Sequence, residues 1–197
     1  MTEDVTIQEK PATNDARIDE ALLQLAAEGA RLTHDAVADI SGVSRRTVYR
    51  RYPDQVALRK RLWSLLSPPG GMPRDLHDLL DWELRQTFEK FDRQAAVMTV
   101  ASASPEGRQM RLEMKKERIA AYNAIFGPHT KELSENQARK AHAAMQLLCG
   151  GLAWREMRDQ WDLNGTEAAE ASAWAVKVLI AHLDREGAQA FDVPTPR

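Results

Sequence analysis

A cluster of basic residues near the N-terminus has the residue types that nucleic-acid contact requires. Between Ser44 and Trp63 the chain carries seven basic residues and one acid, Asp54. The basic residues are Arg45, Arg46, Arg50, Arg51, Arg59, Lys60 and Arg61. An arginine guanidinium donates two parallel hydrogen bonds to guanine and also pairs with phosphate, so the cluster predicts local contact with DNA. A solvated helix face that forms salt bridges is the alternative explanation of such a run.

Individual residues of this cluster have different expected roles. Arg45 and Arg46 lie in the first turn of a predicted helix and are the candidates for base readout. The candidate phosphate contacts are the side chains of Thr33, Thr47 and Tyr49 and the backbone amide at the start of the next helix. Arg50 and Arg51 are expected to divide between phosphate contact and solvent.

The elements that position these residues are helices. Apolar residues recur at helical spacing along the chain, and no alternating β-branched run is long enough to indicate a sheet, so the predicted class is all-α. After a polar leader, residues 1–14, the stretch Asp15 to Glu28 has the apolar stripe of an amphipathic helix, and Gly29 ends it.

A short second helix and a third helix follow, joined by a tight turn. Thr33 and Ser44 have the side chains of N-caps for these two helices, and Gly42 supplies the positive φ that the turn needs. Pro53 ends the third helix, and a fourth is predicted from about Asp54 to Leu66. This pattern predicts a helix-turn-helix whose last helix presents the arginines.

The remainder of the chain reads as a second helical unit. The proline- and glycine-rich segment Ser67 to Pro73 separates it from the first. Helices are expected over 75–90, in a segment ending near Ala103, and over 104–126, 134–159 and 167–185. The predicted organisation is therefore a DNA-binding domain over 15–66, a regulatory and dimerisation domain over 67–187, and a frayed tail over 188–197.

The N-terminal third of the chain resembles a known family. The resemblance is carried by Thr33-x-x-x-Val37-Ala38-x-x-Ser41-Gly42-Val43-Ser44-x-x-Thr47-Val48-Tyr49-Arg50-x-Tyr52-Pro53-x-x-x-Ala57-Leu58. This run resembles the signature of the TetR family of transcriptional regulators. Where family members usually have a phosphate-binding lysine just after the proline, this chain has Gln55, preceded by Asp54.

The resemblance implies a transcriptional repressor that binds a palindromic double-stranded DNA operator as a homodimer. In that family the last two helices form a four-helix dimer interface. Here those helices are rich in small residues, namely Ala138, Ala141, Ala144, Cys149, Gly150, Ala168, Ala171, Ala175 and Ala181. Packing of the same faces within one chain is the alternative explanation of these small residues.

Large apolar side chains in the second unit are candidates for the lining of a ligand cavity. They are Trp82, Met98, Met110, Met114, Met145, Trp154 and Trp174. Such a cavity would hold a small apolar or amphipathic molecule that acts as an inducer. Core packing of these residues is the alternative, and it would leave a regulator without a small-molecule sensor.

Composition bounds the remaining classes. The formal net charge of -2 over 197 residues gives no general attraction to nucleic acid, so any DNA contact must be local. A single cysteine excludes an internal disulfide, and the polar N-terminus with no long apolar run indicates a cytoplasmic protein without a membrane span. We expect no cofactor, no metal site and no enzyme activity, because no acid/base pair or metal-ligand spacing stands out. An all-α carrier or enzyme with a basic surface helix is the remaining alternative.

Overall fold

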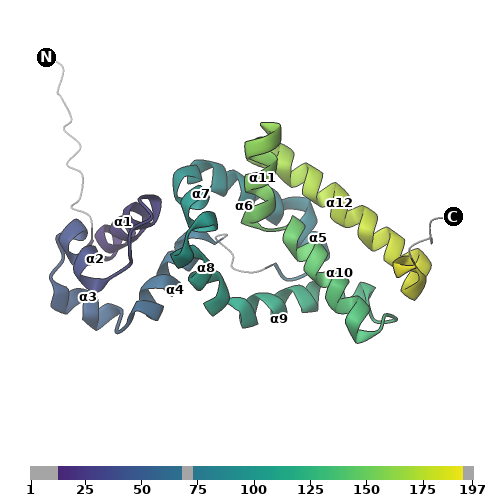
Figure 1. Cartoon of the computed structure of the whole chain (residues 1–197), viewed down its shortest axis with the longest axis horizontal. Helices are drawn as coiled ribbons and strands as arrows, with labels where there is room; N and C mark the ends of the chain where they lie inside the picture. Colours follow the sequence, from purple (N-terminus) through teal and green to yellow (C-terminus); the bar gives the residue numbers. More distant parts are fainter. Residues whose placement is uncertain (1–12, 68–72, 193–197) are drawn as a thin grey trace, which may run out of the picture.

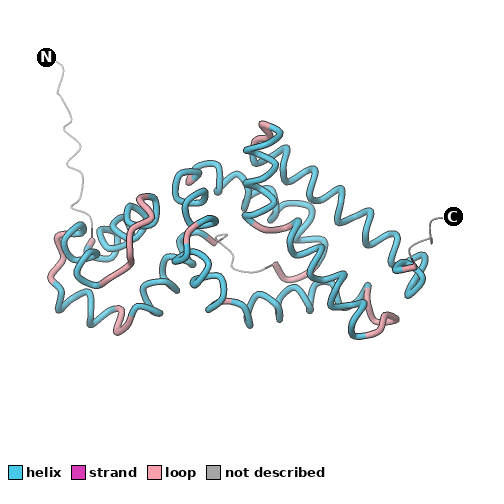
Figure 2. The backbone as a smooth tube through the Cα atoms, in the orientation of Figure 1, coloured by secondary structure: helices cyan, strands magenta, loops and turns pink. Residues whose placement is uncertain are grey.

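Residues 13–67 and 73–192 are described by the computed structural model, and all of their regular elements are helices (Figures 1 and 2). The predicted all-α class is confirmed. In chain order the elements are α1 (Asn14–Ala27), α2 (His34–Ser41), α3 (Arg45–Arg51), α4 (Gln55–Leu66), α5 (Leu76–Asp78), η1 (Leu79–Glu83), α6 (Leu84–Arg93), α7 (Ala95–Ala103), α8 (Pro105–Glu113), α9 (Lys115–Phe126), η2 (Gly127–His129), α10 (Glu135–Leu148), α11 (Gly151–Trp161), α12 (Gly165–Glu186) and η3 (Gly187–Phe191). Most of the predicted leader and part of the predicted tail lie outside the described residues.

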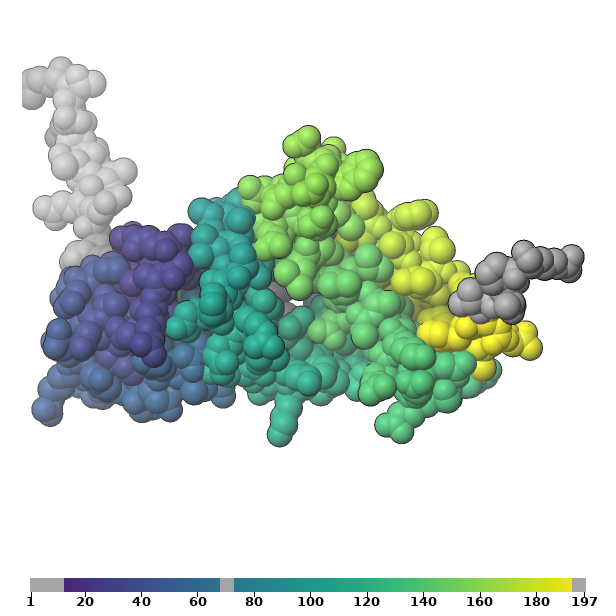
Figure 3. All heavy atoms as spheres, viewed as in Figure 1, coloured from purple at the N-terminus to yellow at the C-terminus, as the bar shows by residue number. Residues whose placement is uncertain are grey.

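Helices α1 to α4 gather at one end of an elongated molecule, and α12 runs along the other end (Figures 1 and 3). Helix α1 begins one residue after its cap Thr13, and its apolar stripe is fully buried at Ile18 and Leu22. Each such side chain stabilises the fold by about 1.5–3 kcal/mol through burial. Val37 and Val48 of α2 and α3 complete this part of the core, which fixes how α3 is presented.

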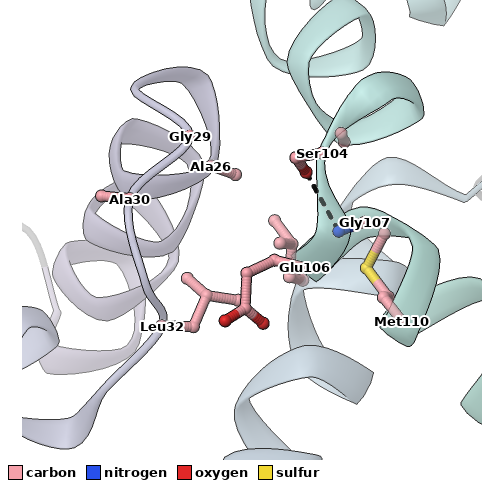
Figure 4. Close-up of a pocket in the computed structure, with 10 residues that line it drawn as sticks. Ala26, Gly29, Ala30, Leu32, Ser104, Glu106, Gly107 and Met110 are labelled. Atoms are coloured by element: carbon pink, nitrogen blue, oxygen red, sulfur yellow. Dashed lines mark hydrogen bonds between the residues drawn. The ribbon is translucent and has the colours of Figure 1, made fainter.

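The junction between the two ends is formed by α1 and α4 on one side and by α7 and α8 on the other. A small cavity of about 20 Å³ lies there. Figure 4 shows its lining, with Gly29 on one side and Ser104 and Gly107 on the other. The Oγ of Ser104 accepts a hydrogen bond from the amide of Gly107, which caps α8. A Cβ on Gly107 would lie 1.6 Å from the carbonyl oxygen of Ala101, so only glycine permits this approach of α8 to α7.

The predicted helix over 104–126 is wrong as a single element. The chain bends at Met114 (φ -89°, ψ 9°), so that α8 and α9 are separate. The tertiary reason is that the last residue of α8, Glu113, is hydrogen-bonded to Arg59 of α4, which anchors α8 against α4. Hydrophobic periodicity continues across this bend and therefore does not reveal it.

The predicted helix over 134–159 also divides in two. Its start is confirmed, because Ser134 and Gln137 form a reciprocal capping box. Gly150 is extended (φ -114°, ψ 165°), and α11 begins after it. A Cβ on Gly151 would lie 3.0 Å from the Cε of Met98, so the glycine lets α11 start against α7. The expected helix over 75–90 is continuous in the structure, and η1 is a π-helical turn within it.

Helix α12 packs along α6 and starts at Gly165, two residues earlier than expected. Its cap is Asn164, which forms a capping box with Glu167. The carboxylate of Asp92 in α6 accepts hydrogen bonds from the Gly165 amide and from the indole of Trp154, and so joins α6, α11 and α12. The start of the predicted frayed tail is instead ordered as η3, where the carbonyl of Ala188 accepts a hydrogen bond from Gln137.

Candidate functional site

Two capped helices and a glycine turn set the position of α3. The Oγ1 of Thr33 accepts from the Ala36 amide at 3.1 Å, and the Oγ of Ser44 accepts from the Thr47 amide at 3.3 Å. Gly42 has φ 64° and ψ 15°, the left-handed conformation that the turn between α2 and α3 requires. A Cβ at this glycine would also lie 2.5 Å from the guanidinium of Arg17.

The exposed side of α3 carries three of the predicted DNA contacts. Arg46, Tyr49 and Arg50 lie three and four positions apart, which places them on one face of the helix, and all three are exposed. We call these three residues the α3 face. Val48, fully buried, lies on the opposite side and docks α3 on the core.

Tyr49 is held in place by a residue that the sequence analysis did not select. The ring of Tyr49 stacks on that of His34, with 3.9 Å between ring centroids and 2° between planes. His34 is buried, and its Nε2 donates a hydrogen bond to the carbonyl oxygen of Tyr52 at 2.6 Å. The stack holds the tyrosine ring in place while 51% of the residue stays exposed. The only sequence signal was a histidine directly after the Thr33 cap.

The basic cluster divides into paired and unpaired cations. Arg45 lies 3.2 Å from Asp35 and 3.9 Å from Asp39, both exposed acids of α2. Arg51 is exposed and pairs with Asp15 of α1, so phosphate could reach it only by replacing that acid. Arg59 and Arg61 pair with acids of other helices, Glu113 and Asp19. Among the described residues, Arg46 and Arg50 form no ion pair, which makes them the free cations of α3.

The start of α4 differs from the expected phosphate contact. Asp54 is the N-cap, and its carboxylate accepts a hydrogen bond from the Ala57 amide at 2.7 Å. The carboxylate therefore occupies an amide that an approaching phosphate would need. It also places a negative charge where the helix dipole would otherwise attract an anion.

A second cavity, of about 430 Å³, is lined in part by Trp63 and Leu66 near the end of α4. Its wall combines α4 and η1 with residues of α6 to α11, and the apolar part includes Leu84, Phe91, Met98 and Met110. The volume falls in the range of small-molecule sites, which is roughly 300–1,000 Å³.

Of the seven residues predicted to line a ligand cavity, the structure places Met98 and Met110 in this wall. Met145 and Trp154 are buried in the core, and Met114 is half-buried, but none of the three contributes to the wall. Trp82 and Trp174 are exposed on the outside, at 46% and 69%. The predicted set is therefore not a single lining.

Charged side chains in the wall were not selected from the sequence. Arg111 donates from Nη1 to the carbonyl oxygen of Ala101 at 2.9 Å, and burial lowers its pKa. The guanidinium of Arg118 lies 5.5 Å from the ring centroid of Trp63 in α4. Burial raises the pKa of Glu83, the last residue of η1, and its Oε2 has no hydrogen-bond partner among the described residues. The wall thus contains ionisable groups within an apolar surface.

Comparison with known proteins adds nothing to this description of the site. No family model matches the chain, and no curated protein or solved structure is significantly similar to it. Within 13–67 and 73–192, none of the helices has both the length and the apolar character needed to cross a bilayer.

Proposed function

We propose that the chain is a DNA-binding transcriptional regulator of the TetR type, in which α2, the Gly42 turn and α3 form a helix-turn-helix. The observation that carries the proposal is the α3 face. Arg46 and Arg50 are free cations there among the described residues, and Tyr49 beside them is held by its stack on His34. Side chains on one face of a helix enter the major groove together, so such a face suits base and phosphate contact.

The contacts divide between base readout and anchoring. Arg46 reads a guanine by donating to O6 and N7, since no acid in the described residues competes for it. Arg45 can join only by exchanging Asp35 for DNA, an exposed ion pair that is worth little. Tyr49, Thr33 and Thr47 bind phosphates and set the register without reading sequence.

The proposed regulator acts as a homodimer. The supporting feature is an exposed apolar strip of α12, Trp174, Val178 and Ala181, which occupies one side of the helix. The opposite side, with Ala168 and Val176, is buried within the chain. Dimerisation would bring two α3 faces to the two halves of a palindromic operator.

Regulation would act through α4. This helix carries Trp63 and Leu66 into the cavity wall and Leu58 and Leu62 into the core. A ligand that fits the cavity better when α4 is displaced would lower operator affinity, by the about 1–3 kcal/mol typical of allosteric coupling. The cavity is the observation that favours a sensor over a regulator without one.

Binding of the full chain to duplexes selected from a random-sequence library tests the proposal. Anisotropy titrations at several salt concentrations should give an affinity that falls steeply as salt rises, because phosphate contacts release counterions. Arg46→Ala should cost about 1–3 kcal/mol and relax preference at one base position.

The matched control is Arg139→Ala, which removes the same charge from an exposed site on α10. It should leave DNA affinity unchanged. The proposal is rejected if no duplex is enriched, or if Arg46→Ala and Arg139→Ala behave alike.

A further inference from the structure

Two arginines of the cavity wall form no ion pair within the described residues. Arg111 and Arg118 both line the cavity, and none of the acids in the described residues forms an ion pair with either. The positive charges of Arg118, Arg155 and Arg108 act together with burial to lower the pKa of Arg111. A partly buried cation whose charged neighbours are other cations is stabilised when an anion binds beside it.

The surroundings of these arginines define the rest of a ligand. The Phe91 ring and the Met98 thioether lie in the wall with leucines and Met110, and give it a mostly apolar surface. A ligand that fills the cavity must therefore combine a negative group with an apolar body.

We propose that the cavity binds a small amphipathic carboxylate, with its carboxylate paired with Arg111 and Arg118 and its apolar tail packed on Phe91 and Met98. As a binding site this stands on the cavity alone. As the inducer site of a repressor it also rests on the proposed function.

Among the described residues of the wall, Glu83 is the only acid and so the only one that favours a cation. Its Oε2 lacks a hydrogen-bond donor, and a bound ammonium would supply one. Glu83, however, forms no ion pair with Arg111 or Arg118 among the described residues. Two unpaired guanidinium groups against one carboxyl favour an anion, with Glu83 closer to its neutral form through burial.

The same arginines connect a bound anion to α4. Arg118 lies over the ring of Trp63, and Trp63 belongs to the helix that joins both ends of the molecule. A carboxylate that draws the guanidinium toward itself competes with this cation–π contact. Occupancy would thereby change the packing of α4, the helix that carries Arg59 and Arg61 to their partners in α8 and α1.

Calorimetric titration of the full chain with three probes of equal chain length tests this assignment. The probes are decanoate, decylammonium and decanol. Decanoate should bind most tightly, and Arg118→Met should weaken it by roughly tenfold or more, the value of a hydrogen bond to a charged group. Arg118→Lys, which keeps the charge, should retain most of the affinity.

Arg139→Met is the control, because it removes the same charge from an exposed position of α10 outside the wall. Circular dichroism melting curves check that each variant is folded. Tighter binding of decylammonium, abolished by Glu83→Gln, would overturn the proposal, as would equal binding of all three probes or none. Because the titrations contain no DNA, failure to bind decanoate rejects the cavity assignment even where operator binding is observed, and the reverse also holds.

Discussion

Arg46 and Arg50 differ from most of the neighbouring basic residues in having no carboxylate partner among the described residues. Arg51, Arg59 and Arg61 each pair with an acid of another helix, and these ion pairs link α3 and α4 to α1 and α8. Both explanations of the basic cluster therefore apply, DNA contact to some of its residues and salt bridges to others. Free cations face outward from α3, and paired cations brace the elements around it.

Asp54 weakens the proposed DNA contact, and its replacement should strengthen it. In Asp54→Ser the hydroxyl can still cap α4, since serine and aspartate are comparable N-caps. The negative charge at the start of the helix is lost, so a phosphate gains access to the amides and the helix dipole. We expect operator affinity to rise several-fold, by about 0.5–1 kcal/mol, while the fold loses at most about 1 kcal/mol of charge–dipole stabilisation.

Anisotropy titration checks the affinity, with Asp75→Ser as the matched control. Asp75 caps α5 by the same hydrogen bond, to the Asp78 amide at 2.9 Å, but lies outside the proposed DNA contact. An equal gain in both variants would mean that net charge, not the α4 start, sets the effect.

Part of this residue-level detail could be predicted. The caps at Thr33 and Ser44 and the turn at Gly42 were predicted, because each depends on one residue and its immediate neighbours. The role of His34 and the partner of Arg51 could not, because both depend on contacts between helices. Charge density along a sequence does not say which cations already have partners.

At the scale of the elements, helix starts were easier to predict than helix breaks. A capping side chain marks a start, as Ser134 does for α10. The bend at Met114 has no such marker, since α8 ends where Glu113 meets Arg59. The break before α11 did have a signal in the adjacent glycines at 150 and 151, of which only Gly150 was noted, as a small residue for close packing.

The ion pair between Arg59 of α4 and Glu113 of α8 should stabilise the fold to a degree that depends on pH. Arg59 donates from Nε and Nη2 to the Glu113 carboxylate at 2.6–2.9 Å, and these bonds lower the pKa of Glu113 below 4.5. The pair therefore stabilises the fold fully above pH 4.5, and this contribution is lost as pH falls through the lower folded-state pKa.

Glu113→Gln should lower the free energy of unfolding by roughly 1–2 kcal/mol at neutral pH, because a charged hydrogen-bond acceptor is replaced by a neutral one. The difference from wild type should shrink below pH 4.5, as urea denaturation at a series of pH values would measure. Glu117→Gln, an exposed change on α9, is the control and should have no effect. A constant difference at every pH would show that packing, not charge, is lost.

At the scale of the whole molecule, the cavity could not be predicted residue by residue. Its wall takes residues from α4, η1 and α6 to α11, so membership depends on how the helices assemble. Met98 and Met110 fit the expectation, but Trp82 and Trp174 lie on the outside. Hydrophobic character identifies residues that avoid water, and it does not separate a cavity wall from a core or from a surface that another subunit covers.

Substitution of Trp174 tests whether another subunit covers an apolar surface of this chain. It is 69% exposed on α12, and Val178, one turn further, is 51% exposed, an apolar strip that a monomer would leave in water. Trp174→Glu places a charge in this strip without disturbing the buried side of the helix. If α12 pairs with its copy, sedimentation velocity should show a dimer for wild type and a monomer for the variant.

Trp161→Glu makes the same change at an even more exposed residue, 75%, at the end of α11, and should leave the dimer intact. Operator affinity should then fall steeply in Trp174→Glu alone, because a monomer engages one half-site and loses the second set of phosphate contacts. A monomeric wild type at micromolar concentration, or dimers in both variants, would place the subunit contact elsewhere. Loss of DNA affinity without loss of the dimer would instead mean that Trp174 acts through the fold of a single chain.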